Sequence, residues 1–425
     1  MLNHKNHVIG VLMVFVATAA TAETLEDAWN SAINNNHQIK SAKADTSASE
    51  QQLHSAQGQR LPDLNVSSAY TQFSETPTAK TQIAGQTAQF STTQAGSVKA
   101  QAIASVPIFT SGRISHSINA AEASLQAVQS NEITSVLNIK MQVAEAYIAV
   151  LRMDSALQVA QSHVDTLELH TKDVNNLFDQ GMVARNDVLA ANVERVNAQQ
   201  LVVQANNQLD IAKARYNQLL DRNLDDEVKL AQQFPDTPQG SLNELSGNAV
   251  KQRPELVALA QQIKSLEQQA QSVKAGLLPQ VAVNGGYQYQ ENRYQAFEGM
   301  WMANVGVDWK LFDGSSGHRS DTLTRQALSL KEQHDDLSSM IGLQVRQAWL
   351  DIQETQKRIA VTQQAIAQAD ENIKVTADRY QQGLSTNTEV LRAEDLRTTT
   401  HYNFNNANYD AALASLHLRR ALGVL

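Results

Sequence analysis

The chain has 425 residues, of which 18% are charged and 5% are aromatic, and its formal net charge is −9. This mild acidic excess, without a basic cluster, argues against a nucleic-acid surface, because phosphate contacts need grouped Lys and Arg. The chain contains no cysteine, which excludes disulfides, thiolate metal sites and lipid attachment through an N-terminal Cys. Phosphate-binding loops and hydrolase motifs are also missing, so the sequence predicts neither an enzyme nor a cofactor or metal site.

The first 22 residues are typical of a secretory signal peptide. A weakly basic start is followed by an apolar run over residues 8–17, and Ala20-Thr21-Ala22 offers a cleavage site before Glu23. The apolar run is shorter than the ~20 residues that a membrane-spanning helix needs, and no later stretch approaches that length. We therefore expect a mature chain that is either soluble outside the cytoplasm or meets a membrane through β-strands.

The mature chain repeats itself, with a first half over residues 23–240 and a second half over 241–425. Arg60-Leu61-Pro62 matches Leu277-Leu278-Pro279, and Gln180-Gly181 matches Gln382-Gly383. Ordered matches of this kind indicate an internal duplication. Each half is predicted to hold a helix, two strands and two long helices. The strands are expected at about 63–74, 97–107, 280–290 and 300–311, and the long helices at about 112–178, 183–222, 318–380 and 385–422.

Long helices are predicted from the placement of Pro and Gly. No Pro occurs between Pro107 and Pro235, and none follows Pro279. Because Pro disfavours a helix interior by ~3 kcal/mol, such runs favour helix. A helix over 112–178 would reach ~100 Å at ~1.5 Å per residue. Its apolar residues recur every three or four positions, which predicts coiled-coil packing. The isolated Gly181 and Gly383 are expected to turn the chain between helices.

The predicted strands alternate apolar and polar residues over about the ~9–11 residues of a tilted membrane strand. Their aromatic residues suit the interface belt of a membrane protein. The predicted belt consists of Tyr287, Tyr289, Trp301 and Trp309. The polar segments 74–96 and 291–299 are expected to be loops. Four strands cannot close a barrel, which needs ~8 or more, so several chains must contribute.

The ordered set of motifs resembles the TolC-type outer-membrane efflux family over nearly the whole mature chain. The motifs are Leu-Pro before each first strand, Val106-Pro107-Ile108-Phe109 and Leu311-Phe312-Asp313-Gly314 after each second strand, the two Gln-Gly turns, and Arg253-Pro254-Glu255-Leu256. The resemblance implies a mixed α/β membrane protein. Its homotrimer would form a twelve-stranded β-barrel in the lipid of the outer membrane, continued by an α-helical coiled-coil barrel across the periplasm. The implied partners are a periplasmic adaptor and an inner-membrane pump, proton-driven or of the ABC type.

The resemblance also implies that the two helix–turn–helix tips, 177–189 and 379–391, form the periplasmic entrance and contact the adaptor. The adaptor-contacting residues would be Gly181, Gly383, Asp187, Val188, Leu189, Val390 and Leu391. Tyr380 and Asp187 match family positions that hold the entrance shut. Ser385 stands where the family has an Arg, so Arg185, Arg379 or Arg392 would have to substitute. Glu389 could form an acidic ring that favours cations.

Three functions remain open from the sequence. The leading interpretation is a passive conduit for small molecules in a tripartite efflux system. The same scaffold could instead serve as the outer-membrane duct of a type I protein secretion system. A soluble periplasmic coiled-coil scaffold is the third alternative. The tip residues could also be solvated residues without a role in gating.

Overall fold

The structure is a computed structural model that describes residues 22–425, so the predicted signal peptide lies outside the described residues except for Ala22. The chain forms two compact units. Unit 1 contains residues 22–36, 142–236 and 354–413, and unit 2 contains residues 37–141, 237–353 and 414–425. Each unit takes segments from both predicted halves, so neither half is a compact unit by itself.

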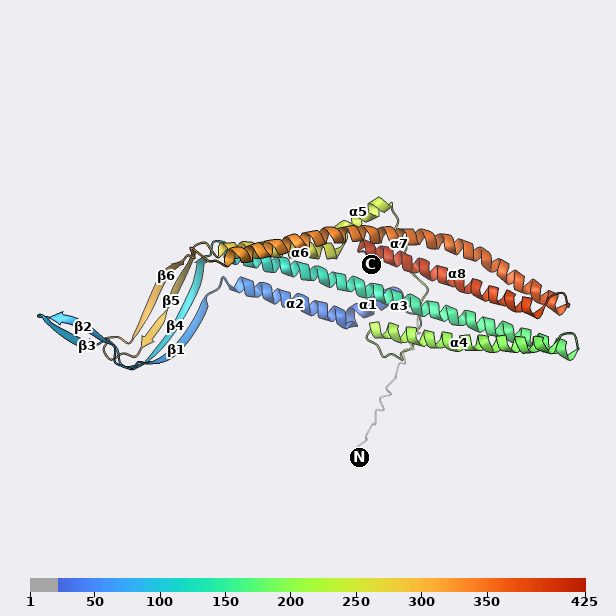
Figure 1. Ribbon diagram of the computed structural model, residues 1–425, viewed down its shortest axis with the longest axis horizontal. Helices are drawn as coiled ribbons and strands as arrows, with labels where there is room; N and C mark the ends of the chain where they lie inside the picture. The colour runs from blue at the N-terminus through green and yellow to red at the C-terminus, as the bar shows by residue number, and fades with distance from the viewer. Residues whose placement is uncertain (1–21) are drawn as a thin grey trace, which may run out of the picture. The chain divides into compact units, whose positions relative to one another are not determined.

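Fourteen elements follow one another along the described chain (Figure 1). The helices are α1 (Leu25–Asn35), α2 (His37–Gly58), α3 (Arg113–Asp179), α4 (Arg185–Leu219), α5 (Leu242–Gln252), α6 (Pro254–Ala275), α7 (Ser316–Gln381) and α8 (Asn387–Leu422). The strands are β1 (Asp63–Gln72), β2 (Thr78–Ile83), β3 (Gln86–Ser91), β4 (Gly96–Phe109), β5 (Gln280–Gln290) and β6 (Gly299–Asp308).

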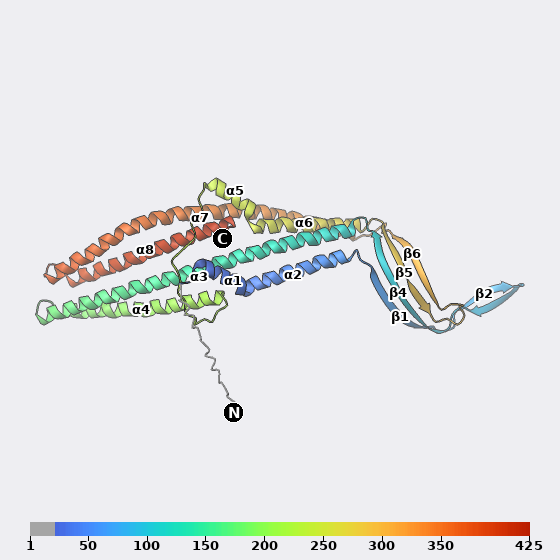
Figure 2. The same cartoon turned by 180° about the vertical axis from the view of Figure 1, so that it is seen from behind.

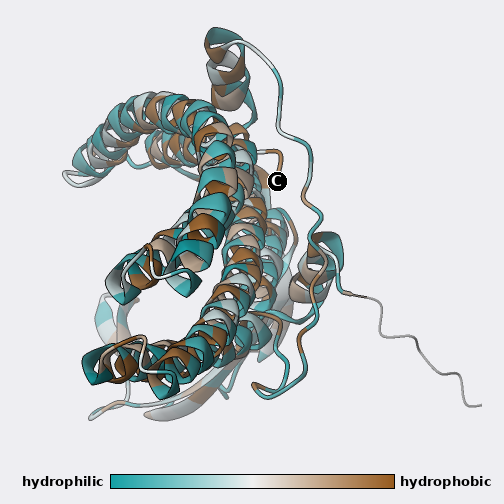
Figure 3. Cartoon of the chain, turned by 90° about the vertical axis from the view of Figure 1, so that its right-hand side faces the viewer, coloured by the Kyte–Doolittle hydropathy of each residue, from teal (hydrophilic) through white to brown (hydrophobic). Residues whose placement is uncertain are grey.

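The Pro-free segments form long helices, with 67 residues in α3 and 66 in α7. In unit 1, α3 and α4 form one helical hairpin, and α7 and α8 form a second. Figures 1 and 2 show the four helices side by side in the order α4, α3, α8, α7. Hydrophilic and hydrophobic residues alternate around each long helix (Figure 3). None of the helices in the described part is long and apolar enough to span a membrane.

The prediction of a single helix before the strands is wrong for both halves, because the structure has two helices at each place. Asn36 separates α1 from α2 with ψ 129°, and Arg253 separates α5 from α6 with ψ 118°. Pro254 favours this break because a residue before Pro avoids the helical region. The Asn36 amide donates a hydrogen bond to the carbonyl oxygen of Leu219 at 2.9 Å.

The same contact recurs in the second half of the chain, where the Arg253 guanidinium donates to the carbonyl oxygen of Ala421 at 3.1 Å. Leu219 ends α4, and Ala421 lies in the last turn of α8. At each break, the side chain of the residue between the two helices therefore caps a carbonyl that has no intrahelical partner at the end of a long helix. The same residue within a continuous helix would not do so. The two Arg253 contacts with Glu255, at 2.9 and 3.1 Å, hold the guanidinium in place.

Unit 2 contains an antiparallel four-stranded sheet in the order β1-β4-β5-β6. The register pairs Val66 with Ala102, Ala102 with Tyr287, and Tyr287 with Trp301, so these residues share one face. That face is apolar, and Val66 is 74% exposed and Trp301 81% exposed. Its members include Leu64, Val66, Tyr70, Val98, Ala102, Val106, Val283, Tyr287, Tyr289, Trp301, Val305 and Val307. The opposite face carries polar residues such as Asn65, Gln101, Asn284 and Asn304.

The prediction that residues 74–96 form only a loop is wrong, because they contain the hairpin of β2 and β3. Six residue pairs join these strands, which form a sheet of their own. Ala84 (φ 49°) and Gly85 (φ 84°) make the tight turn. This turn type is usually marked by Asn-Gly or Asp-Gly, and neither pair is present here. The hairpin projects from the end of the sheet that lies away from α2 and α6 (Figure 1).

The predicted strand over residues 300–311 is too long, because β6 ends at Asp308. Asp308 pairs with Gln280, the first residue of β5, so the ladder has no partner beyond it. Trp309 therefore lies outside the strand, although its side chain is exposed like that of Trp301. The other three predicted belt residues lie on the apolar face of the sheet.

Candidate functional site

At the two helical tips of unit 1, the first helix of each hairpin, α3 or α7, ends in the same way. Gly181 and Gly383 both have φ +72°, in the left-handed region that favours glycine. Beyond them, Met182 N–H donates to the Leu177 carbonyl and Leu384 N–H donates to the Arg379 carbonyl. These are Schellman motifs, which satisfy orphan carbonyls at a helix end.

The second helices of the two hairpins, α4 and α8, begin in different ways. Thr386 and Glu389 form a capping box at α8, with Thr386 N–H donating to the Glu389 carboxylate at 2.8 Å and Glu389 N–H donating to Thr386 Oγ1 at 3.3 Å. The Ser385 hydroxyl also donates to this carboxylate, at 2.6 Å. That hydrogen bond, followed by those from Thr386, lowers the pKa of Glu389. Glu389 and Ser385 lie at the entrance that the sequence predicts. In the structure their hydrogen bonds cap the start of α8. Ala184, before α4, provides no side-chain cap.

Apolar residues pack the two hairpins together near the tips. Val174, Ala191, Tyr380 and Val390 form a buried cluster, and Val188 packs against it. Tyr380 is 5% exposed, and its hydroxyl is buried without a hydrogen-bond partner. Burial, followed by the charge of Asp187, raises the pKa of Tyr380. The structure therefore brings the predicted pair Tyr380 and Asp187 near each other but forms no hydrogen bond between their side chains.

A polar bridge that the sequence did not reveal joins the same two hairpins. The Asn387 side chain, in the first turn of α8, donates to the Asp187 carbonyl at 3.2 Å. Its Oδ1 lies 2.6 Å from Nε2 of His170 on α3. Both side chains are buried, and burial lowers the pKa of His170 although the Asn387 hydrogen bond opposes this. The His170 ring also packs on Tyr380 at 5.4 Å between centroids.

The remaining predicted tip residues lie in varied environments. Leu391 packs beside a second buried cluster of Val164, Leu167 and Ala198. Leu189 is exposed, as are the glycines of both turns and the side chains of Arg185 and Arg392. The exposed residues are thus available to a partner, whereas Val188, Val390 and Leu391 hold the hairpins together.

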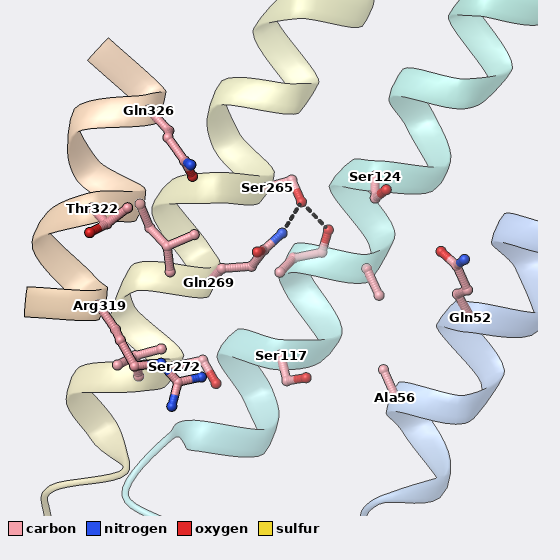
Figure 4. Close-up of a pocket in the computed structure, with 14 residues that line it drawn as sticks. Gln52, Ala56, Ser117, Ser124, Ser265, Gln269, Ser272, Arg319, Thr322 and Gln326 are labelled. Carbon is pink, nitrogen blue, oxygen red and sulfur yellow. Dashed lines mark hydrogen bonds between the residues drawn. The ribbon is translucent and has the colours of Figure 1, made fainter. Parts of the chain in front are cut away.

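Unit 2 contains a groove of about 660 Å³ between α2, α3, α6 and α7, lined by hydroxyl, amide and apolar side chains (Figure 4). The hydroxyl of Ser265 donates to the Ala120 carbonyl at 2.8 Å, and the Gln269 amide donates to Ser265 at 3.2 Å. Apart from Arg319, the side chains that line the groove are uncharged. Across residues 22–425, no group of three His, Asp or Glu is placed to hold a metal ion.

Comparisons with known proteins agree on one family. The model of the outer membrane efflux protein family matches residues 28–221 and 245–424. The outer membrane efflux protein BepC of Brucella suis is 21% identical over 419 residues, covering 96% of this chain and 87% of that protein. The outer membrane protein TolC of Vibrio cholerae is 22% identical over 431 residues, covering 96% and 93%. The crystal structure of VceC from Vibrio cholerae has the same fold, with a TM-score of 0.79, 17% identity and coverage of 94% and 96%.

Proposed function

Because the chain belongs to the outer membrane efflux protein family, we propose that three copies of it assemble into one export channel. The chain is an outer-membrane efflux channel protein that extends into the periplasm, and it is not an enzyme. In the proposed trimer, four strands from each chain complete a twelve-stranded β-barrel. The long helices of the three chains continue this barrel as a coiled-coil barrel.

The open edges of the sheet support the barrel. In the described part of the chain, β1 pairs only with β4, and β6 pairs only with β5. Unpaired backbone groups are costly in lipid, so a membrane sheet has to close on itself. Four strands are too few for closure, and edge strands of neighbouring copies are suitable partners. The apolar face over all four strands is suited to lipid, and the polar face to a water-filled interior.

The outer helices of unit 1 support the same assembly. α4 and α7 lie at the two edges of the four-helix layer (Figures 1 and 2). Large apolar residues are exposed along one face of each: Leu189, Val193, Val196, Val203 and Ile211 on α4, and Val361 and Val375 on α7. Their helical spacing places each set on one stripe. Contact between the α4 stripe of one copy and the α7 stripe of the next would cover both.

The side chains of the unit 2 groove support a passive conduit, for which another protein supplies the energy of transport. The groove of unit 2 is lined by hydroxyl, amide and apolar side chains with Arg319 as the single charged residue, so it offers few charges to hold a substrate. With no catalytic or nucleotide-binding motif in the chain, energy has to come from an inner-membrane pump, proton-driven or of the ABC type, through a periplasmic adaptor at the tips. The proposed cargo is small molecules.

The assembly is tested by the mass of the detergent-purified protein and by its current in planar bilayers. We expect three copies per particle and discrete conductance steps. Val203→Glu, which puts a charge on the α4 stripe, should reduce the trimer yield severalfold because the carboxylate would be buried without a partner. Gln208→Glu adds the same charge outside the stripe and should leave the trimer intact. A monomeric wild type, or equal trimer yields for both variants, would contradict the proposal.

A further inference from the structure

Glu23, the residue that follows the predicted signal peptide, is held in unit 1 through its whole backbone. Its N–H donates to the Lys229 carbonyl at 2.8 Å, and its carbonyl accepts from the Ala231 N–H at 2.9 Å, as in a short parallel bridge. The hydroxyl of Tyr147 on α3 donates to the same Glu23 carbonyl at 2.8 Å. The preceding residue, Ala22, is exposed. The bonded part of the chain therefore includes Glu23 from its first backbone atom.

The Glu23 carboxylate is bound as completely as its backbone. The Arg222 guanidinium donates to both carboxylate oxygens, at 2.6 and 2.9 Å, in a bidentate ion pair. The hydroxyl of Tyr216, near the end of α4, donates to the same carboxylate at 3.0 Å. Because a bidentate pair fixes direction as well as position, these contacts set the orientation of Glu23.

Packing within unit 1 places the two tyrosine donors. Tyr147 and Tyr216 are both 0% exposed, and their rings meet edge to face with centroids 6.0 Å apart. Burial raises the pKa of Tyr147 to about 12. Burial, followed by the charge of Glu23, raises the pKa of Tyr216. Both hydroxyls therefore keep their protons at neutral pH and donate them to Glu23.

The segment that pairs with Glu23 leads from the first half of the duplicated chain towards the second. Residues 222–236 follow α4 without forming a helix, and their one bridge is the bridge to Glu23. Near its end, Phe234 packs on Tyr147 with ring centroids 6.4 Å apart. Backbone groups that are shielded from water need hydrogen-bond partners. Glu23 supplies them in the middle of this irregular segment.

We propose that Glu23 is the first residue of the mature chain and that its contacts form a binding site for the processed N-terminus. This Glu23 site consists of Tyr147, Tyr216, Arg222 and the backbone of Lys229 and Ala231. Its ligand is an N-terminal residue that carries an α-ammonium group and a side-chain carboxylate.

Cleavage changes the group that donates to Lys229. Hydrolysis breaks the bond between the carbonyl carbon of Ala22 and the nitrogen of Glu23. One water supplies a hydroxyl to the carbon and a proton to the nitrogen, and at neutral pH the new carboxyl group loses a proton and the new amine gains one. A charged donor makes a hydrogen bond roughly twice as strong as a neutral donor does. Cleavage therefore tightens the hold of Glu23 on residues 222–236.

The same contacts set the order of cleavage and docking. A protein that recognises an extended peptide does so through the backbone groups of that peptide. In the docked state, the N–H and the carbonyl of Glu23 are already paired with Lys229 and Ala231. A precursor that docks first is protected at the bond that has to be cut, so cleavage precedes docking.

Mass spectrometry of the protein from the outer membrane identifies the mature N-terminus. We expect the N-terminal peptide to begin at Glu23, and a chain that begins at any other residue overturns the proposal. Acetylation near neutral pH then turns the ammonium back into a neutral amide, selectively because an α-amino group is less basic than a lysine. Hydrogen exchange at the Ala231 amide, which donates to Glu23, should accelerate severalfold. Unchanged exchange after acetylation would contradict the role of the ammonium group.

Arg222→Gln tests the carboxylate half of the site without altering the sequence around the cleaved bond. Hydrogen exchange at Ala231 and removal of Glu23 by an aminopeptidase should both accelerate at least about tenfold, because bonds to a charged group are lost and proteolysis follows the population of the open state. Folded precursor with this change should also be cut faster by signal peptidase than folded wild-type precursor. Arg215→Gln removes the same charge from an exposed position of α4 and should behave like the wild type.

Tyr216→Phe is a milder variant, which keeps the ring against Tyr147 and removes one donor to Glu23. Exchange at Ala231 and loss of Glu23 should rise severalfold, by less than in Arg222→Gln. Unchanged exchange of the α6 amides in unit 2 shows that each variant is folded. Rates equal to those of the wild type in both variants would overturn the Glu23 site, because none of these contacts would then hold the N-terminus.

Discussion

At the scale of single residues, the contact between the two tips depends on Asn387. One side-chain amide serves partners on both helices of the first hairpin, accepting from His170 of α3 and donating to the Asp187 carbonyl at the start of α4. An amide can fill both roles because it carries a donor and an acceptor on one planar group. The Ser385 hydroxyl, two residues earlier, donates instead to the Glu389 carboxylate at 2.6 Å, within the start of α8.

Asn387→Leu should therefore loosen the tips. The change leaves the buried imidazole of His170 without its Asn387 partner, at a cost of about 1–3 kcal/mol, and removes the side-chain bond to the Asp187 carbonyl. Hydrogen exchange of the amides at the start of α8 should accelerate by at least about tenfold, which corresponds to ~1.4 kcal/mol. Asn192→Ala is the control, because Asn192 bonds only to the Val188 carbonyl of its own helix. Equal protection in both variants would show that the bridge does not hold the tips.

At the scale of elements, the shape of the tips is set by how helices end. Both turns use the same Schellman geometry, so the duplication extends to the backbone. Apart from its two neighbours in the chain, a Cβ on Gly181 or Gly383 would meet no atom within 4 Å. The left-handed backbone favours glycine in these turns, and the surface above them remains free for a partner.

Two substitutions of Gly383 separate the turn from the docking surface. Gly383→Val strains the left-handed turn by about 1–2 kcal/mol, whereas Asn tolerates that conformation. If the turn surface docks an adaptor, both variants should lose dye export from cells and adaptor co-purification, because each adds a side chain to the contact. Trimer levels in the outer membrane should stay normal. Normal export by Gly383→Asn would mean that the turn geometry matters and that this surface is not a contact.

At the scale of the whole molecule, the two faces of the sheet should have opposite environments. Val305 lies on the apolar face and Asn304 on the polar face of the same strand. Val305→Lys would place a charge in lipid, at a cost of about 2–4 kcal/mol near the membrane midplane. The amount of folded trimer in the outer membrane should fall severalfold. Asn304→Lys adds the same charge to the polar face and should leave the trimer level near that of the wild type; the reverse order would invert the assignment of the faces.

Much of this organisation could be predicted from the sequence, because it depends on local periodicity. Pro-free runs with apolar residues every three or four positions predicted α3 and α7 within a few residues, and alternation identified the apolar face of the sheet. The breaks at Asn36 and Arg253 were missed, although Pro254 was a local signal for the second. The hairpin of β2 and β3 was missed because its Ala84-Gly85 turn lacks the usual residues.

Only the tertiary structure decided which distant residues meet. His170 and Asn387 are 217 residues apart, and His163 and Glu394 are 231 residues apart, so no local pattern links them. β6 ends at Asp308 because its partner β5 begins at Gln280, a limit imposed by another strand. Sequence by itself determined the four long helices, the four strands of the main sheet, the duplication and the apolar faces, since side-chain periodicity and backbone sterics are local. Packing decided the bridge at the tips, because burial and pairing of polar groups depend on neighbours that only the folded chain supplies.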